Sequence, residues 1–412
     1  MPLGVHHYVA RRGMMPKPGL ADAAGRGAWN PSGGPAPGQL PAGPGTVTVE
    51  VHRTAGAQGA LPEEAGIMTM PRAQDWRRRG GYFSWHPAAR DALPVDVFHV
   101  EVGDPGAPVL LLVHGWPTSS IDWFDVAGLL SARFRVCALD FPGYGFSGKP
   151  QGWGYSLTRD AELIEFYLAE VLGAGAAVIV AHDRGDSVAL VHAARCAEGQ
   201  PAARIEHLVL SNGNIFLPLS NLTSAQRQIL HPDSGPQIAA ALPAPVLAQA
   251  LGAATFTPPR EPGDPVVEAL TATFAHDDGI KVLPETIQYL AERSQDEQAW
   301  LTALADARFP VSVIWGLSDT VSPPRVASYV WDRYLMLKPG ANRLYFIPDA
   351  SHYLQADRPD AFVQVLLHAL GPADRAPGPL GPEPGAPLLV DTSRERLPTA
   401  VDLLRADPAG TN

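Results

Sequence analysis

Residues 178–189 contain side chains that could carry out covalent catalysis. They read V-I-V-A-H-D-R-G-D-S-V-A, so a β-branched run gives way within a few residues to an Ala-rich run that is compatible with a helix. Asp183 stands at the apex of this predicted strand–turn–helix, and the small residues Ala181 and Gly185 lie two positions before and after it. Small neighbours are needed because bulky ones would collide with the strand and the oncoming helix at a strained apex. The pattern predicts a carboxylate nucleophile at Asp183; the alternative is an Asp that only caps the following helix.

A second carboxylate and a histidine follow later predicted strands. Residues 311–315 run into G-L-S-D, which ends at Asp319, and residues 343–347 run into P-D-A-S-H-Y, which contains His352. A histidine base needs a carboxylate that fixes its tautomer and stabilises the imidazolium, and Asp319 could supply it. The end of the preceding strand, S-N-G-N, has no competing carboxylate. The order Asp183, Asp319, His352 therefore predicts a catalytic triad, although His352 by itself could be an ordinary loop histidine.

The apolar run at residues 109–113 ends in H-G-W-P, at the place where an oxyanion hole could be built. The backbone N–H of Trp116 would be one donor, and the N–H of Arg184, directly after the apex, would be the other. His114 would then line the substrate pocket. The alternative is a Gly-Pro turn with a structural histidine.

A carboxylate nucleophile determines the reaction. It can attack an sp3 carbon that bears a leaving group and form an alkyl ester, after which His352 activates a water that attacks the ester carbonyl. The oxyanion hole would stabilise the tetrahedral species of this second step. This chemistry needs neither a metal nor an organic cofactor, and its substrate would be a small apolar electrophile.

Strands that alternate with helices must position these residues. The expected strands lie at residues 95–102, 109–113, 134–139, 176–181, 205–210, 311–315 and 343–347, and the expected helices include 121–130, 157–172 and 359–370. This alternation predicts an α/β fold with a mostly parallel, doubly wound sheet, whose catalytic groups gather at the carboxyl ends of the strands. Nearly a hundred residues separate the strand near 205–210 from the strand near 311–315, and this segment is predicted to be a helical cap that shields the site from water.

The expected organisation has five parts. Residues 1–75 are a disordered leader and 372–412 a Pro/Gly-rich tail, since both ends are rich in Gly and Pro and poor in aromatic residues. Residues 76–213 and 307–371 are the two parts of the α/β core, and 214–306 are the cap. Met68 and Met70 are alternative start positions, and residues 388–390 and 401–404 could add a late strand or helix.

The composition of the chain of 412 residues excludes several classes of protein. A net charge of -11 without a basic run argues against nucleic acid or anionic membranes as partners. The apolar runs, such as residues 109–113, are too short to span a bilayer. The two cysteines, Cys137 and Cys196, have neither metal spacing nor the density of a disulfide framework. We therefore expect a soluble, cytoplasmic protein.

These motifs resemble the epoxide hydrolase and haloalkane dehalogenase branch of the α/β-hydrolase fold, and within it most resemble the mesoderm-specific transcript protein and its bacterial relatives. The resemblance covers roughly residues 80–370. It rests on H-G-W-P-T-S-S-I-D-W (114–123), L-D-F-P-G-Y-G-F-S-G-K-P (139–150), H-D-R-G-D (182–186), L-S-N-G-N-I-F (210–216) and S-H-Y (351–353). The resemblance implies an α/β-hydrolase fold with an Asp nucleophile, and favours an epoxide hydrolase-like reaction.

The chain departs from these families at three places. Haloalkane dehalogenases usually carry Trp where this chain has Arg184, so a halide would need another donor, such as the indole of Trp116. Fluoroacetate dehalogenases carry a second Arg where this chain has Ser187, so Arg184 could instead pair with a local acid such as Asp186. Epoxide hydrolases use cap tyrosines, for which Tyr289 is the candidate, unless it only packs inside the cap.

Two other functions remain as alternatives. One is a haloalkane or haloacid dehalogenase that uses the same triad and releases free halide. The other is a ligand-binding α/β-hydrolase with little turnover, for which loss of His352 would not weaken binding.

Overall fold

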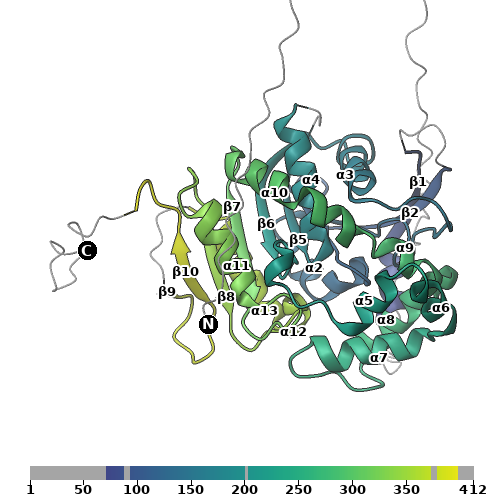
Figure 1. The fold of residues 1–412 in the computed structure, drawn as a ribbon. Coiled ribbons are helices and arrows are strands. Elements are labelled where there is room, and N and C mark those ends of the chain that lie inside the picture. The colour runs from purple at the N-terminus through teal and green to yellow at the C-terminus, as the bar shows by residue number, and fades with distance from the viewer. Residues whose placement is uncertain (1–70, 88–92, 200–202, 373–377, 398–412) are drawn as a thin grey trace, which may run out of the picture. The chain divides into compact units, whose positions relative to one another are not determined.

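A sheet of ten strands runs through the part of the chain that the computed structural model describes, which is residues 71–87, 93–199, 203–372 and 378–397 (Figure 1). The strands are β1 (Gly80–Trp85), β2 (Val95–Val102), β3 (Val109–Val113), β4 (Arg135–Leu139), β5 (Ala176–His182), β6 (Arg204–Ser211), β7 (Val311–Gly316), β8 (Arg343–Ile347), β9 (Gly378–Pro379) and β10 (Leu388–Thr392). Their order across the sheet is β1-β2-β4-β3-β5-β6-β7-β8-β10-β9. The six central strands, β4, β3, β5, β6, β7 and β8, pair in parallel with their neighbours. The antiparallel strands β1 and β2 extend one edge of the sheet, and β10 and β9 extend the other.

The parallel strands are buried on both faces, which explains their continuous apolar sequences. In β3, the side chains of Leu110, Leu111 and Leu112 are fully buried, and in β5 the same is true of Ile179 and Val180. Such runs are typical of a parallel sheet that helices cover on both sides. Because β3, β5, β6, β7 and β8 are neighbours, the loops at their carboxyl ends lie side by side.

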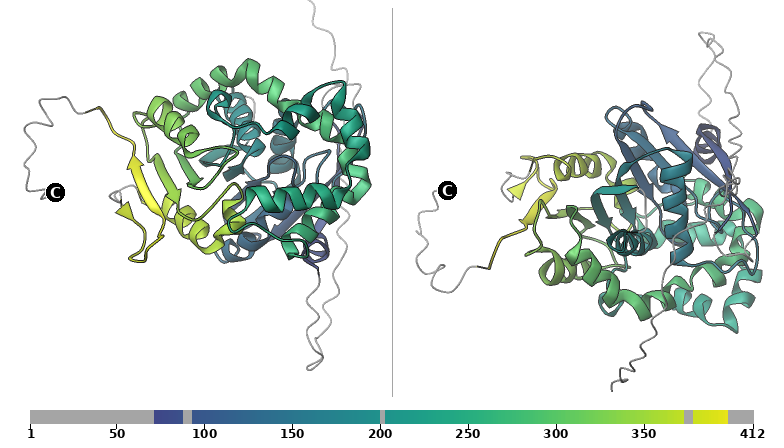
Figure 2. Two further views of the ribbon diagram at one scale, coloured as in Figure 1. Left: turned by 60° about the horizontal axis from the view of Figure 1, so that its bottom comes forward. Right: turned by 90° about the horizontal axis from the view of Figure 1, so that it is seen from above.

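Helices cover both faces of this sheet (Figure 2). On one face α3, α4 and α10 pack in series, and on the other α2 packs against α13. The helices are α1 (Arg72–Arg79), α2 (Phe124–Leu130), α3 (Leu157–Phe166), α4 (Arg184–Ala197), α5 (Ser224–Leu230), α6 (Ser234–Ala241), α7 (Ala244–Thr255), α8 (Pro265–Ala275), α9 (Leu283–Thr286), α10 (Tyr289–Asp306), α11 (Pro324–Val330), α12 (Leu354–Asp357) and α13 (Pro359–Ala369). The predicted doubly wound α/β fold is therefore confirmed.

The long segment between β6 and β7 is helical, as predicted, and contains α5 to α10. Helices α5 to α9 gather together beyond one end of the sheet (Figure 1). Helix α10 differs, because it packs against α4 in the helix layer of the core. The segment predicted as the cap, residues 214–306, therefore includes a helix, α10, that begins at Tyr289 and packs against α4.

The ends of the described chain also differ from the sequence-based expectation. Helix α1 begins at Arg72, inside the predicted leader, and buries Trp76. Strand β10 pairs with β8, so residues 388–392 of the predicted tail extend the sheet. The rest of the leader, with Met68 and Met70, and residues 401–404 lie outside the described residues.

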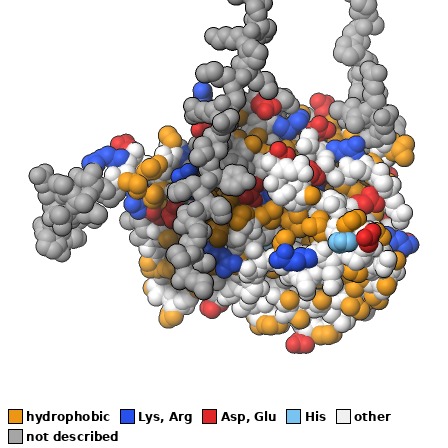
Figure 3. All heavy atoms as spheres, in the orientation of Figure 1, with side chains coloured by type: hydrophobic (Ala, Val, Ile, Leu, Met, Phe, Trp, Pro, Cys, Tyr) orange, Lys and Arg blue, Asp and Glu red, His pale blue; other side chains and the backbone are white. Residues whose placement is uncertain are grey.

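Acidic and basic side chains are interspersed with hydrophobic ones on the face shown in Figure 3. Within the described ranges, no single helix is long and apolar enough to cross a membrane, although the pair α6 and α7, bent by 102°, passes a test of length and composition together. Both cysteines are free thiols, with Cys137 buried and Cys196 partly exposed.

Candidate active site

Asp183 lies at the sharp turn between β5 and α4, with φ 52° and ψ -118°. This left-handed region is strained for a residue with a side chain. Two glycines make room for the turn. A Cβ on Gly185 would lie 2.6 Å from the carbonyl oxygen of Val113, and a Cβ on Gly115 would lie 2.6 Å from the Cβ of Asp183. The turn therefore requires both glycines, and it presents the Asp183 carboxylate at the carboxyl edge of the sheet.

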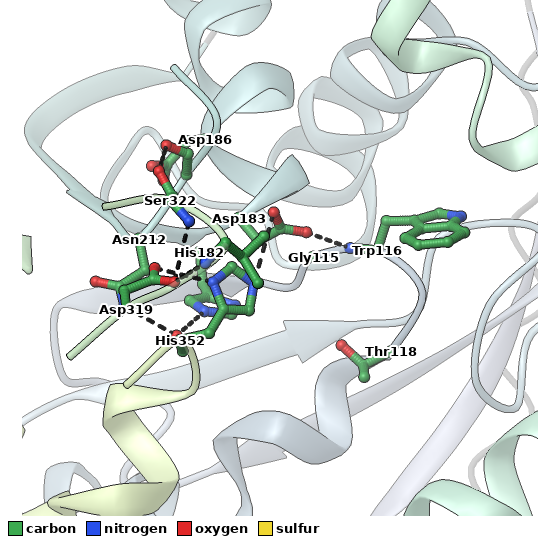
Figure 4. Close-up of polar contacts among 12 residues, drawn as sticks. Gly115, Trp116, Thr118, His182, Asp183, Asp186, Asn212, Asp319, Ser322 and His352 are labelled. Atoms are coloured by element: carbon green, nitrogen blue, oxygen red, sulfur yellow. Dashed lines mark hydrogen bonds and ion pairs between the residues drawn. The ribbon is translucent and has the colours of Figure 1, made fainter. Parts of the chain in front are cut away.

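The Asp183 carboxylate is almost fully buried and touches two kinds of partner (Figure 4). Its Oδ2 accepts a hydrogen bond of 2.8 Å from the backbone N–H of Trp116, and the backbone N–H of Arg184 also interacts with the carboxylate. Its Oδ1 lies 3.7 Å from Nε2 of His352. Burial raises the pKa of Asp183, while the charge of His352 and the two N–H donors act in the opposite direction. Oδ2 is thus held by the backbone N–H of Trp116, and Oδ1 faces the histidine.

His352 lies between two carboxylates. Its Nδ1 is 3.0 Å from Oδ2 of Asp319, and Asp319 Oδ1 accepts hydrogen bonds from the backbone N–H groups of Val321 (2.8 Å) and Ser322 (3.0 Å). Burial acts to lower the pKa of His352, but the negative charges of Asp319 and Asp183 raise it to about 9. The structure therefore brings together the three residues of the predicted triad, with Asp319 oriented to keep a proton on Nδ1.

Two residues that the sequence did not single out hold the backbone of His352 in place. His182 Nε2–H donates to the carbonyl oxygen of His352 at 2.8 Å. The Asn212 side-chain amide donates to the carbonyl oxygens of Ser351 (2.7 Å) and His352 (3.1 Å), and its oxygen accepts from the N–H of Gly316 at 2.9 Å. Asn212 therefore ties the loops after β6, β7 and β8 together. Its place in the S-N-G-N segment at a strand end was the signal for this role.

The side chain of Arg184 points away from the triad. One of its terminal nitrogens donates to the carboxylate of the buried Asp160, and its guanidinium lies 5.1 to 5.6 Å from the ring centres of Phe141, Tyr144 and Tyr289. Burial raises the pKa of Asp160 to about 6, against the lowering effect of Arg184. The expected partner Asp186 instead accepts from the backbone N–H of Ser211 at 3.2 Å. Arg184 thus contributes its backbone N–H to the site, while its charge is neutralised elsewhere.

His114, which was predicted to line the substrate pocket, is bound to the backbone through both of its ring nitrogens. Its Nε2 accepts from the backbone N–H of Phe141 at 3.1 Å, and its Nδ1–H donates to the carbonyl oxygen of Gly115 at 2.8 Å. Burial lowers its pKa to about 3. With both ring nitrogens bonded to the backbone, His114 is a neutral, structural histidine that joins the loops after β3 and β4.

The remaining candidate positions have specific neighbours. The Trp116 indole N–H lies 3.2 Å from the hydroxyl of Thr286 in α9. The hydroxyl of Ser187 accepts a 2.6 Å hydrogen bond from the buried Arg293 of α10. Tyr289, at the start of α10, is buried, and its hydroxyl has no hydrogen-bond partner among the described residues. The segment between β6 and β7 therefore supplies contacts to several residues around Asp183.

Within the described ranges, no group of three or more His, Cys, Asp or Glu side chains is arranged to hold a metal ion.

A family model and a solved structure both match this chain and both describe the same fold. Residues 108–359 match the sequence model of a protein family described as alpha/beta hydrolase fold. A solved structure of an alpha/beta hydrolase fold protein from Burkholderia ambifaria superimposes with a TM-score of 0.56 and 27% identity, over 70% of this chain and 99% of that one.

Three curated relatives are similar over most of the chain. LipZ of Mycobacterium tuberculosis, provisionally named a hydrolase, is 31% identical over 74% of this chain and 99% of its own length. The human mesoderm-specific transcript homolog protein is 29% identical over 72% of this chain and 87% of its own length. Haloalkane dehalogenase 2 of Mycobacterium bovis is 26% identical over 66% of this chain and 90% of its own length.

Proposed function

Because this chain belongs to the α/β-hydrolase fold family and is a hydrolase of that fold, we propose that it acts through a covalent ester formed on Asp183. One observation carries the proposal. The two oxygens of Asp183 have different partners, since Oδ2 is 2.8 Å from the Trp116 N–H and Oδ1 is 3.7 Å from His352 Nε2. A nucleophile held in this way has one oxygen fixed and the other free to attack.

In the first step, Oδ1 of Asp183 attacks an sp3 carbon of the substrate and displaces its leaving atom. The Asp183 carboxylate becomes an ester, with Oδ1 bonded to the substrate carbon. Oδ2 becomes the carbonyl oxygen and stays next to the backbone N–H of Trp116, and the backbone N–H of Arg184 is proposed as its second donor. These donors can then stabilise an oxyanion on Oδ2, which is what the second step requires.

In the second step, neutral His352 takes a proton from a water as that water attacks the ester carbonyl carbon of Asp183. Asp319 stabilises the imidazolium that forms, through the 3.0 Å contact with Nδ1. The tetrahedral species collapses by breaking the bond between the carbonyl carbon and Oδ1. The product leaves with Oδ1 and takes a proton from His352, and Asp183 regains a carboxyl oxygen from water.

The leaving atom is proposed to be an oxygen, as in an epoxide-like substrate. Burial raises the pKa of Tyr289, with the Asp183 carboxylate acting in the same direction, so its hydroxyl keeps its proton. A protonated hydroxyl near the nucleophile can donate that proton to an oxygen that leaves carbon. The new carboxylic acid of Asp183 carries the proton that restores Tyr289, so water is the only other reactant consumed.

A dehalogenase on the same triad is the second candidate, because a haloalkane dehalogenase is among the relatives. Two contacts favour a substrate whose leaving atom is an oxygen rather than a halide. The Trp116 indole N–H, the candidate halide donor, faces Thr286 at 3.2 Å, and the Arg184 guanidinium pairs with Asp160. A haloacid clamp is also disfavoured, because the second arginine position is Ser187, which binds Arg293.

Helices α5 to α9 are proposed to act as the cap over this site. Two hydrogen bonds support the idea: His352 N–H to the carbonyl oxygen of Thr255 in α7 (3.2 Å), and the Trp116 indole to Thr286 in α9. A covered site would exclude bulk water and favour a small substrate with an apolar body.

The Asp183→Ala variant tests the proposal. With a panel of epoxides, haloalkanes and activated esters, the wild-type protein should give diol, halide or acid, and Asp183→Ala should give none while keeping its circular dichroism spectrum. Asp104→Ala, which alters an exposed loop carboxylate, is the matched control and should keep full activity. Turnover retained by folded Asp183→Ala would overturn the proposal.

A further inference from the structure

Asn214 is a buried polar residue whose side chain no described residue satisfies. It lies three residues after β6, and its side chain is 1% exposed. Neither its amide nitrogen nor its amide oxygen has a hydrogen-bond partner among the described residues. Burying an unpaired polar group destabilises a protein, so a residue of this kind needs a reason to be retained.

The backbone on both sides of Asn214 is held firmly. The carbonyl oxygen of Gly213 accepts a 2.6 Å hydrogen bond from the hydroxyl of Ser322, and the carbonyl oxygen of Ile215 accepts from Arg293. A Cβ on Gly213 would lie 2.2 Å from Oδ2 of Asp186, so the loop is also pressed against the start of α4. The structure fixes the position of Asn214, and its amide meets the Tyr289 hydroxyl without forming a hydrogen bond of normal length and angle. This is the arrangement expected of a group prepared for a ligand.

The loop that carries Asn214 lies beside the proposed reaction site, since the backbone N–H of Asp183 donates to the carbonyl oxygen of Ser211 at 3.0 Å. Strand β6 pairs with β5 so that Ser211 lies opposite His182, which brings the loop after β6 beside Asp183. Burial and the Asp183 carboxylate raise the pKa of Tyr289, while a contact with the Asn214 side chain acts to lower it. No hydrogen bond of normal length and angle joins the Tyr289 hydroxyl to a described residue. Two buried, unsatisfied polar side chains thus adjoin each other near the nucleophile.

We propose that Asn214 donates its amide N–H to the substrate atom that leaves carbon when Asp183 attacks, together with the hydroxyl of Tyr289. Two donors to one acceptor would suit a substrate oxygen such as that of an epoxide. As charge develops on that oxygen, both hydrogen bonds strengthen, which lowers the barrier to ester formation. This role rests on the proposed Asp183 ester.

A comparison of two buried asparagines on the same loop tests the idea. Asn212 makes three hydrogen bonds and Asn214 makes none with the described residues, so they should respond oppositely to an isosteric apolar substitution. Asn214→Leu should leave the melting temperature unchanged or raise it by about 2 to 4 °C, since it removes unsatisfied groups. Asn212→Leu should lower the melting temperature by at least about 4 °C.

The functional readout is the rate at which Asp183 is esterified. In a His352→Gln background, where the ester should persist, the rate of adduct formation is followed by intact mass with an epoxide panel. Adding Asn214→Leu should slow esterification about 10- to 100-fold, the effect of losing one hydrogen bond to developing charge. A purely structural asparagine would instead lose stability and leave the rate of the folded fraction unchanged.

Each outcome of these two measurements either supports or overturns the proposed role of Asn214. Slower esterification with an unchanged or higher melting temperature supports the role of Asn214. Equal rates of esterification in His352→Gln and in His352→Gln/Asn214→Leu would overturn that role, as would a clear loss of stability in Asn214→Leu. Either result would leave the proposed Asp183 ester standing. No adduct in His352→Gln itself would instead overturn the proposed ester, and the role of Asn214 with it.

Discussion

Oδ1 of Asp183 and Nε2 of His352 lie 3.7 Å apart in a buried site, so the charge of each group depends on the other. In the free protein, His352 also contacts Asp319, and its pKa is about 9. At neutral pH the histidine is therefore protonated and cannot act as a base. Esterification removes the charge of Asp183, so the pKa of His352 should fall and release the base when the second step needs it.

Asp183→Asn imitates this loss of charge. We expect the pKa of His352, measured by NMR titration of labelled histidine, to fall from about 9 in the wild-type protein toward its ordinary range. Asp278→Asn, an exposed substitution, should leave it unchanged. An equal pKa in wild type and Asp183→Asn would show that the two groups are not coupled.

The interaction of His352 with its carboxylate neighbours should also make the free energy of unfolding depend on pH. The folded protein binds the proton of His352 more tightly than the unfolded chain does, so this interaction stabilises fully below the ordinary histidine pKa of about 6.5. The stabilisation should be lost as the pH rises through about 9. Urea unfolding of wild type and His352→Gln across this range measures it. The stability difference between the two proteins should shrink with rising pH, and a difference that grows would contradict the assignment.

Gly115→Ala should lower activity strongly without a change in any polar group. The new Cβ would lie 2.6 Å from Cβ and 2.7 Å from Oδ2 of Asp183, so the carboxylate must move away from the Trp116 N–H. We expect kcat/KM to fall at least about 100-fold, as for a nucleophile misplaced by about 1 Å. The control is Gly128→Ala in α2, where a Cβ meets nothing within 4 Å and activity should be retained. Normal activity in Gly115→Ala would mean that the site tolerates a different carboxylate position.

Asp160→Asn should destabilise the fold strongly. Asp160 and Arg184 form an ion pair with side chains only 3% and 1% exposed, and the substitution leaves the guanidinium charge buried without a counter-charge. Breaking such a pair costs about 3 to 5 kcal/mol in the free energy of unfolding. The matched control is Asp75→Asn, which breaks the half-exposed pair with Arg79 and should cost about 0.5 kcal/mol or less. Urea unfolding measures both, and equal small effects would show that Asp160 is not needed to balance Arg184.

The sequence predicted the elements and the triad because those signals are local. Short apolar runs marked β3, β5, β7 and β8, and each predicted triad residue followed one of these strands. The predicted α/β-hydrolase fold and the relationship to the mesoderm-specific transcript and haloalkane dehalogenase branches are confirmed by the family match and the relatives.

The partners of these residues were harder to predict because they come from distant segments. Asp160 precedes Arg184 by 24 residues, and Arg293 follows Ser187 by 106. Residue type alone also could not show that both nitrogens of His114 bind the backbone. The late strand β10 was only one of several alternatives, since a short apolar run in a Pro-rich tail gives little periodic signal.

The covalent ester on Asp183 is tested most directly by the intact mass of His352→Gln after incubation with epoxides, haloalkanes and activated esters. Without the base the ester should persist, and the added mass identifies the reaction: a whole epoxide, an alkyl group without halide, or an acyl group. We expect an adduct with the mass of a whole epoxide that maps to the peptide containing Asp183 and is missing from His352→Gln/Asp183→Asn. Folded His352→Gln that gains no mass with any substrate in the panel, or gains it at another residue, would contradict a nucleophilic role for Asp183.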